Sequence, residues 1–124
     1  MKIIRHKKSA AFTLVEIMIV VAIIGLLAAI AIPNFVKARA TSQLNACINN
    51  LRQIDAAANQ WALENRKTTG NAIVMNTDLV SYIKVNSSGL IPPCPASGIY
   101  TMAVVGSNPT CSLSTLATLP HRLP

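Results

Sequence analysis

The pattern of hydrophobic and polar positions begins with a long apolar run. No polar side chain occurs from Ile17 to Ile32, and the wider stretch from Phe12 to Ile32 adds only Thr13 and Glu16. Twenty-one helical residues span about 32 Å, which matches the hydrocarbon core of a bilayer. The pattern therefore predicts a membrane-spanning helix over residues 12–33 that carries one carboxylate.

A second helical pattern follows Pro33. Between polar residues, apolar side chains recur at spacings of three and four, at Leu44, Cys47, Ile48, Leu51, Ile54, Ala58, Trp61 and Ala62. This predicts an amphipathic helix over residues 34–66, ended by the polar run that leads to Gly70. Because proline removes one backbone hydrogen bond, we expect the two segments to form one long helix with a bend near Pro33.

After the amphipathic segment the helical period fades. The stretch TDLVSYI, residues 77–83, predicts a short helix capped by Asn76 or Thr77. The stretches IYTMAVV (99–105) and TCSLSTL (110–116) predict two strands, joined by GSNP in a hairpin. The expected fold class is α+β, with a long N-terminal helix, apolar in its first half and amphipathic in its second, packed on a small antiparallel sheet.

Charge refines this picture at the N-terminus. The formal net charge is +7, and four of the positive charges precede the apolar run, at Lys2, Arg5, Lys7 and Lys8. Positive flanks stay in the cytoplasm, so the N-terminus should face inward and the chain after Pro33 outward. The sequence shows no basic cluster with interleaved aromatic residues, so nucleic-acid binding stays open but unsupported.

The N-terminal residues resemble those of type IV pilins and of the pseudopilins of type II secretion. The resemblance covers about residues 7–35 and rests on a basic leader, a small residue before Phe12, Glu16 four residues later, the apolar run and Pro33. It implies a leader peptide over residues 1–11.

The same resemblance implies processing and assembly. A prepilin peptidase would cut between Ala11 and Phe12, and Phe12 would be N-methylated; the family usually has glycine where this chain has Ala11. Residues 12–33 would then be the transmembrane and filament-core helix, and residues 34–124 a pilin-like globular domain. The implied partners are further copies of the chain, the prepilin peptidase and methyltransferase, an inner-membrane assembly platform, and the membrane before assembly.

Glu16 agrees with that implication on chemical grounds. Cleavage would create a positively charged amine at Phe12, and in a stacked bundle this amine can lie beside Glu16 of a neighbouring copy. A buried pair contributes more to register than to net stability, since desolvation offsets much of the attraction. We therefore expect Glu16 to set the stagger of otherwise uniform apolar helices.

The expected function is that of a structural subunit of a type IV pilus-like filament. Its precursor would lie in the bacterial inner membrane, and the assembled filament in the periplasm or on the cell surface. The alternative within the family is a pseudopilin of a type II secretion system. Outside the family, the alternatives are a monomeric membrane-anchored binding module and an ordinary secretory signal, for which Ala29-Ile30-Ala31 offers a cleavage site.

Cysteines and histidines are few. Cys94 and Cys111 enclose 16 residues across the expected hairpin and are expected to form a disulfide, although bridges from either one to Cys47, or free thiols, remain alternatives. Cys47 lies on the apolar stripe, which favours a buried small side chain. No metal site or cofactor is expected, because C-x-x-C is missing and His6 and His121 stand at opposite ends. Four acidic residues and no glycine-rich phosphate loop argue against an enzyme.

Overall fold

The structure is a computed structural model that describes residues 11–116 and 118–124. Residues 1–10, which hold most of the expected leader and its basic side chains, lie outside the described residues. The chain divides into two compact units, Met1–Val36 (unit 1) and Lys37–Pro124 (unit 2). Each unit is described by itself.

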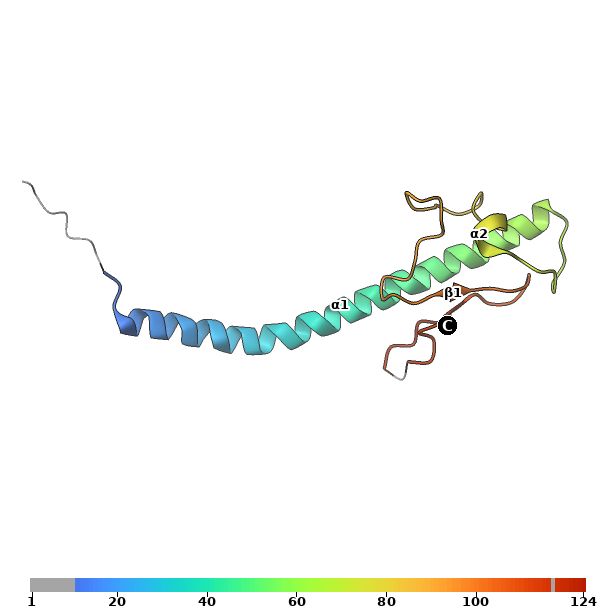
Figure 1. The fold of residues 1–124 in the computed structure, drawn as a ribbon. Coiled ribbons are helices and arrows are strands. Elements are labelled where there is room, and N and C mark those ends of the chain that lie inside the picture. Colours follow the sequence, from blue (N-terminus) through green and yellow to red (C-terminus); the bar gives the residue numbers. More distant parts are fainter. Residues whose placement is uncertain (1–10, 117) are drawn as a thin grey trace, which may run out of the picture. The chain divides into compact units, whose positions relative to one another are not determined.

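The first element is helix α1, which runs from Leu14 to Glu64 and comprises 51 residues (Figure 1). Pro33 lies inside α1 without ending it. The bend expected at Pro33 stays a prediction. By length and composition, the apolar part of α1 could cross a membrane, and none of that part is buried. The predicted apolar helix is confirmed, beginning two residues after Phe12.

The C-terminal end of α1 is closed by backbone hydrogen bonds. The Lys67 N–H donates to the Ala62 carbonyl at 2.8 Å, and the Arg66 N–H donates to the Leu63 carbonyl at 3.3 Å. This is a Schellman motif, which places one residue in the left-handed region, here Arg66 with φ of 52°. The amphipathic helix therefore ends two residues before the predicted end at 66, and Arg66 rather than Gly70 takes the left-handed turn.

Helix α2 is a single turn, Met75–Asp78. The predicted helix over residues 77–83 was wrong in position and length, and neither Asn76 nor Thr77 caps it, since the N-cap residue is Val74. The Val74 N–H instead donates to Asp78 Oδ2 at 2.8 Å, so a carboxylate from within the turn satisfies the free backbone donor at its start.

The sheet consists of β1 (Tyr100–Thr101) and β2 (Thr110–Cys111), which pair antiparallel with Tyr100 opposite Cys111. The antiparallel pair is confirmed, but each strand is much shorter than predicted, and residues 102–109 connect them. The strands are short because another segment takes their hydrogen bonds. The Ile73 N–H donates to the Ala103 carbonyl, and the Val105 N–H donates to the Asn71 carbonyl. The second half of the expected first strand thus pairs with the segment after α1.

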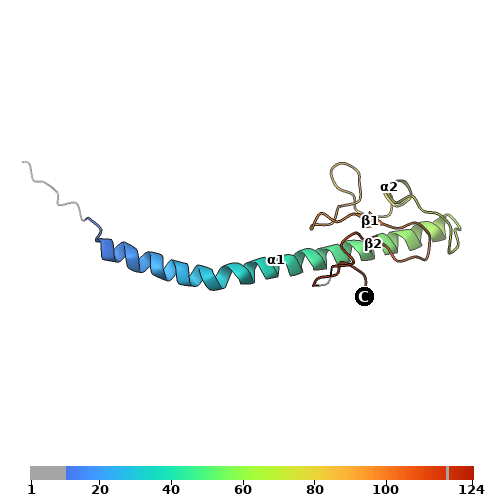
Figure 2. The ribbon, with the colours of Figure 1, turned by 60° about the horizontal axis from the view of Figure 1, so that its bottom comes forward.

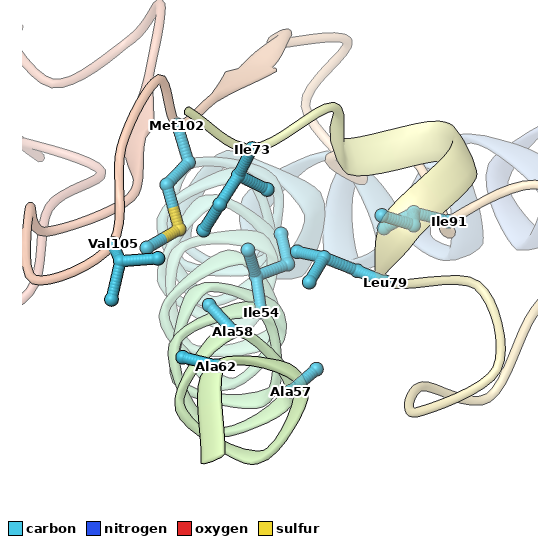
Figure 3. Close-up of a cluster of buried hydrophobic side chains, with 9 residues drawn as sticks. All are labelled: Ile54, Ala57, Ala58, Ala62, Ile73, Leu79, Ile91, Met102 and Val105. Carbon is cyan, nitrogen blue, oxygen red and sulfur yellow. The ribbon is translucent and has the colours of Figure 1, made fainter. Parts of the chain in front are cut away.

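One face of α1 carries the main core of unit 2 (Figure 3). It combines four residues of α1 with five from the rest of the unit: Ile54, Ala57, Ala58, Ala62, Ile73, Leu79, Ile91, Met102 and Val105. Three alanines on the helix let the neighbouring segments approach its backbone closely. Figures 1 and 2 both show α2 and the strands alongside this part of α1. The helix packed on a small sheet is confirmed.

Candidate functional site

The expected cleavage site precedes helix α1. Ala11 and Phe12 belong to no helix or strand and are exposed, with 83% of the Phe12 surface accessible. A peptidase requires a peptide bond that is free of helical hydrogen bonds and open to approach. The structure therefore leaves the bond between Ala11 and Phe12 accessible, while cleavage and methylation themselves stay predictions.

Glu16 lies in the first turn of α1 and contacts Thr13. The Thr13 N–H and hydroxyl both donate to Glu16 Oε2, at 2.8 and 2.7 Å, and the Glu16 N–H lies 3.3 Å from Thr13 Oγ1. This reciprocal arrangement is a capping box, which satisfies two backbone donors at the start of a helix. Both short bonds use the same oxygen. Oε1 has no hydrogen-bond partner within residues 11–116 and 118–124.

The apolar residues around Glu16 lie on every side of the helix. Every large apolar side chain from Phe12 to Val36 is more than half exposed. Pro33 lies within this exposed segment. A helix that is apolar all round is stable only against lipid or against other helices.

A second group of polar and sulfur-bearing side chains lies inside unit 2. The structure brings Cys94 and Cys111 together, as the expected hairpin required, and adds Cys47 from α1 and His121 from the C-terminal segment. We call these four residues the Cys/His cluster. All four are buried, their ligand atoms lie within 4.8 Å of one another, and Cys94 Sγ lies 3.5 Å from His121 Nδ1. The cysteines are free thiols in this structure, and the Cys94–Cys111 disulfide stays a prediction.

Neighbouring donors shape the acidity of these thiols. Burial raises the pKa of Cys47 to about 12, although the Tyr100 hydroxyl donates to its sulfur. Burial also opposes ionisation of Cys94, but hydrogen bonds from the N–H groups of Ala96 and Gly98 and from the Cys47 and His121 side chains outweigh it and lower the pKa of Cys94 to about 7. Burial raises the pKa of Tyr100 as well, and Asn50 Nδ2 donates to its hydroxyl oxygen at 3.1 Å.

Sequence reasoning missed Thr13 and His121. The spacing T-x-x-E at Thr13 and Glu16 is a capping-box signature, so that signal was present. His121 stands in a stretch without periodicity, and no short motif links it to the cysteines. The separation of His6 and His121 gave no reason to expect a metal site, yet His121 alone lies beside all three cysteines.

Comparison with known proteins gives a consistent result. Residues 6–32 match the family described as "Prokaryotic N-terminal methylation motif". The chain is 48% identical over 59 residues to the type IV major pilin protein PilA of Myxococcus xanthus. This match covers 48% of this chain and 27% of that protein. It is 30% identical over 105 residues to the fimbrial protein EcpB of Eikenella corrodens. This match covers 82% of this chain and 62% of that protein.

A third relative is a protein of a secretion system. The chain is 28% identical over 94 residues to the type II secretion system core protein G of Pseudomonas aeruginosa, covering 64% of this chain and 66% of that protein. The chain spans only 27% to 46% of the length of the type IV pilins and fimbrial proteins with the strongest matches. No solved structure matches it. These findings show that the N-terminal segment of the chain carries the prokaryotic N-terminal methylation motif and is similar to the corresponding segments of type IV pilins and of a type II secretion core protein.

Proposed function

We propose that the chain is a structural subunit of a type IV pilus-like filament. It is inserted in the bacterial inner membrane as a prepilin, cleaved between Ala11 and Phe12, N-methylated at Phe12, and polymerised through its N-terminal helix. Residues 12–33 form the membrane and filament-core segment and residues 34–124 the outer domain. The role is structural rather than catalytic.

The observation that carries this proposal is the exposed apolar surface formed by Phe12 and by α1 as far as Val36. A contiguous apolar surface of this extent requires lipid or other proteins around it. The same segment contains the methylation motif over residues 6–32. Lipid surrounds this surface in the precursor, and the equivalent helices of neighbouring copies surround it in the filament.

Glu16 supplies the directional interaction that an apolar bundle lacks. Cleavage leaves a charged amine at Phe12, and Oε1 of Glu16, which has no partner among the residues the structure describes, can accept from such an amine on a neighbouring copy. An unpaired carboxylate in an apolar segment is costly, by up to about 2.5–3.5 kcal/mol at the bilayer centre, so the ion pair favours the filament over the membrane. The pair fixes the stagger between successive helices.

The proposed partners follow from this route. They are other copies of the chain, the prepilin peptidase that cleaves and methylates it, and an inner-membrane assembly platform. The precursor lies with its basic N-terminus in the cytoplasm and unit 2 outside, following the distribution of positive charge. The assembled filament lies in the periplasm or at the cell surface.

A pseudopilin of a type II secretion system is the second candidate. The match to core protein G favours it, because that match extends over 94 residues and well beyond the N-terminal motif. The two candidates share cleavage and helix-mediated assembly and differ in filament length. Long surface fibres indicate a pilin, and short polymers confined to the periplasm indicate a pseudopilin.

Electron microscopy and quantification of sheared polymer test the proposal. Cells that express the chain should produce filaments that are missing from a deletion strain. Glu16→Val should leave membrane insertion intact and abolish the polymer, since the incoming amine would lack its partner, a loss of about 3–5 kcal/mol per contact. A protein that stays monomeric in detergent and in membranes would instead be a membrane-anchored binding module, and normal polymer from Glu16→Val would contradict the role of the carboxylate.

A further inference from the structure

The Cys/His cluster gathers side chains from four separate segments of unit 2. Cys47 comes from the middle of α1, Cys94 from the loop before β1, Cys111 from β2, and His121 from the C-terminal segment. The shortest of the three sequence intervals between consecutive members is ten residues. The fold therefore assembles, at one buried point, a set of groups that no local sequence motif brings together.

The number and type of these groups match a tetrahedral metal site. Three sulfurs and one imidazole nitrogen make a Cys₃His set, one of the common ligand sets of structural zinc. Zinc uses all three cysteines, whereas any internal disulfide leaves one of them without a sulfur partner. His121 is 4% exposed, so its ring is withdrawn from water together with the sulfurs.

The distances fit the same set. With Zn–S of about 2.3 Å and Zn–N of about 2.0–2.1 Å, tetrahedral ligands lie about 3.8 Å apart for two sulfurs and about 3.6 Å for sulfur and nitrogen. The observed separation of Cys94 Sγ and His121 Nδ1 is 3.5 Å, and no pair in the cluster exceeds 4.8 Å. Closure around a metal requires each pair to approach by at most about 1 Å.

Backbone and side-chain donors also lie around the cluster. The N–H groups of Ala96 and Gly98 lie near Cys94, and the Tyr100 hydroxyl, which accepts from Asn50 Nδ2 at 3.1 Å, lies near Cys47. Such donors orient metal-bound sulfur and stabilise its negative charge. Gly98 also makes room for the cluster, because a Cβ at that position would collide with Cys111 Sγ.

We propose that the Cys/His cluster is a structural zinc site of unit 2. The ion binds the three thiolates and Nδ1 of His121, which leaves the ring proton on Nε2. It ties α1, the loop before β1, β2 and the C-terminal segment to one point. A sheet of two residue pairs gives these segments little other backbone connection. The site does not depend on filament assembly, so it stands or falls separately from the proposed function.

Metal analysis of the purified full-length chain tests this proposal. The chain is expressed with zinc in the medium and kept in detergent, and zinc is measured per mole of protein by mass spectrometry. We expect one zinc per chain, alkylation of the three thiols only after the metal is removed, and unfolding at a lower denaturant concentration after chelation. Trp61 fluorescence reports the unfolding, since this single tryptophan packs against the core. Cobalt in place of zinc should give thiolate-to-metal charge-transfer absorption.

Variants distinguish a built site from incidental binding. His121→Ala should lose stoichiometric zinc, and Cys47→Ser should weaken the cobalt charge-transfer band. Tyr100→Phe, which keeps all four ligands, should weaken zinc affinity about tenfold by removing a hydroxyl that lies near Cys47. His6→Ala, in the uncleaved precursor, and Ser112→Ala, next to Cys111, are the matched controls and should keep one zinc.

Three results would overturn the zinc site. One is a zinc-free wild-type chain with three free thiols after expression with zinc. Another is recovery of a Cys94–Cys111 disulfide by peptide mapping without reduction, which would confirm the disulfide in its place. The last is zinc that remains bound in His121→Ala and whose removal changes neither thiol reactivity nor the unfolding curve. The wild-type measurements decide the question even where a ligand variant fails to fold.

Discussion

Thr13 and Glu16 bind each other at the start of α1, where the backbone N–H and the hydroxyl of Thr13 share one carboxylate oxygen at 2.8 and 2.7 Å. Glu16 therefore has a local role in capping the helix besides the role we propose for it in assembly. The two roles use different properties of the side chain. Capping needs a hydrogen-bond acceptor, and pairing with an amine needs a negative charge.

Glu16→Gln separates these roles. Glutamine can still close the capping box, so the helix start should be retained, but it cannot form an ion pair. We expect sheared polymer to fall as far as with Glu16→Val. Thr13→Val is the matched control, because it removes the cap at a cost of about 1 kcal/mol and keeps the charge. If Glu16→Gln assembled normally and Thr13→Val failed to assemble, filament formation would depend on the helix cap and not on the charge of Glu16.

Processing defines the start of the mature chain. Intact-mass measurement of protein from the membrane or filament fraction should give a chain that begins at Phe12 and carries one N-methyl group. Ala11→Gly, which restores the residue usual in the family, should be processed at least as completely. A start at Ile32 would indicate ordinary signal cleavage, and retention of Met1 would indicate a plain anchor.

Burial on α1 predicts a contrast between two leucines. Leu51 is fully buried and Leu63 is 81% exposed on the same helix. Leu51→Ala should lower the free energy of unfolding of unit 2 by about 2–5 kcal/mol, because it removes apolar contacts and leaves a cavity. Leu63→Ala should change it by less than about 0.5 kcal/mol. Denaturant titration followed by Trp61 fluorescence measures both, and equal effects would contradict the packing described above.

Gly98 provides a test of close packing near β2. A Cβ added there would collide with Cys111 Sγ and would lie 3.1 Å from Leu113 Cγ. Gly98→Ala should therefore destabilise unit 2 by about 1–3 kcal/mol through overpacking. Gly89→Ala is an informative comparison, because its Cβ meets no atom within 4 Å and its cost comes from a φ of 72° alone. An unfolding curve for Gly98→Ala that matches the wild type would show that this region relaxes freely.

Substitution of Arg66 by glycine should stabilise unit 2, in contrast to the substitution of Gly98 by alanine. Arg66 holds the left-handed position of the Schellman motif, with φ of 52°, and a side chain there costs about 1 kcal/mol relative to glycine. Arg66→Gly should raise the free energy of unfolding by roughly 0.5–1 kcal/mol. The same denaturant titration measures it, with Lys67→Gly as a control that should not stabilise. A loss of stability in Arg66→Gly would mean that the arginine side chain makes compensating contacts.

The sequence predicted the helix well, because its signal is local and repeated. The apolar stripe correctly placed Cys47, Leu51, Ile54 and Ala62 on the buried face, and the apolar run correctly predicted the exposed first half. Because these apolar residues recur at helical spacing, each one independently indicates the same helix and the same buried face. The error at the C-terminal end was small: the helix ends at Glu64 instead of residue 66, because the Schellman hydrogen bonds close it there.

The strands and the Cys/His cluster were harder to predict, because they depend on which distant segments meet. Residues 99–105 have the composition of a strand, yet Ala103 and Val105 bond to the segment after α1 instead of continuing β1. Nothing in their alternation specifies that partner. His121 likewise follows no motif, and only the folded chain brings it to Cys94. The expected Cys94–Cys111 proximity succeeded because a hairpin is a local contact.

The brevity of β1 and β2 has a consequence for the behaviour of the protein at high local concentration. Long strand edges can recruit strands from other molecules and so promote edge-to-edge aggregation, whereas each strand here offers an edge of only two residues. Within the described residues, unit 2 therefore presents little template for cross-β growth. On the proposed assembly route, copies crowded together at a membrane would therefore remain distinct through their outer domains, and ordered association would be left to the apolar helices.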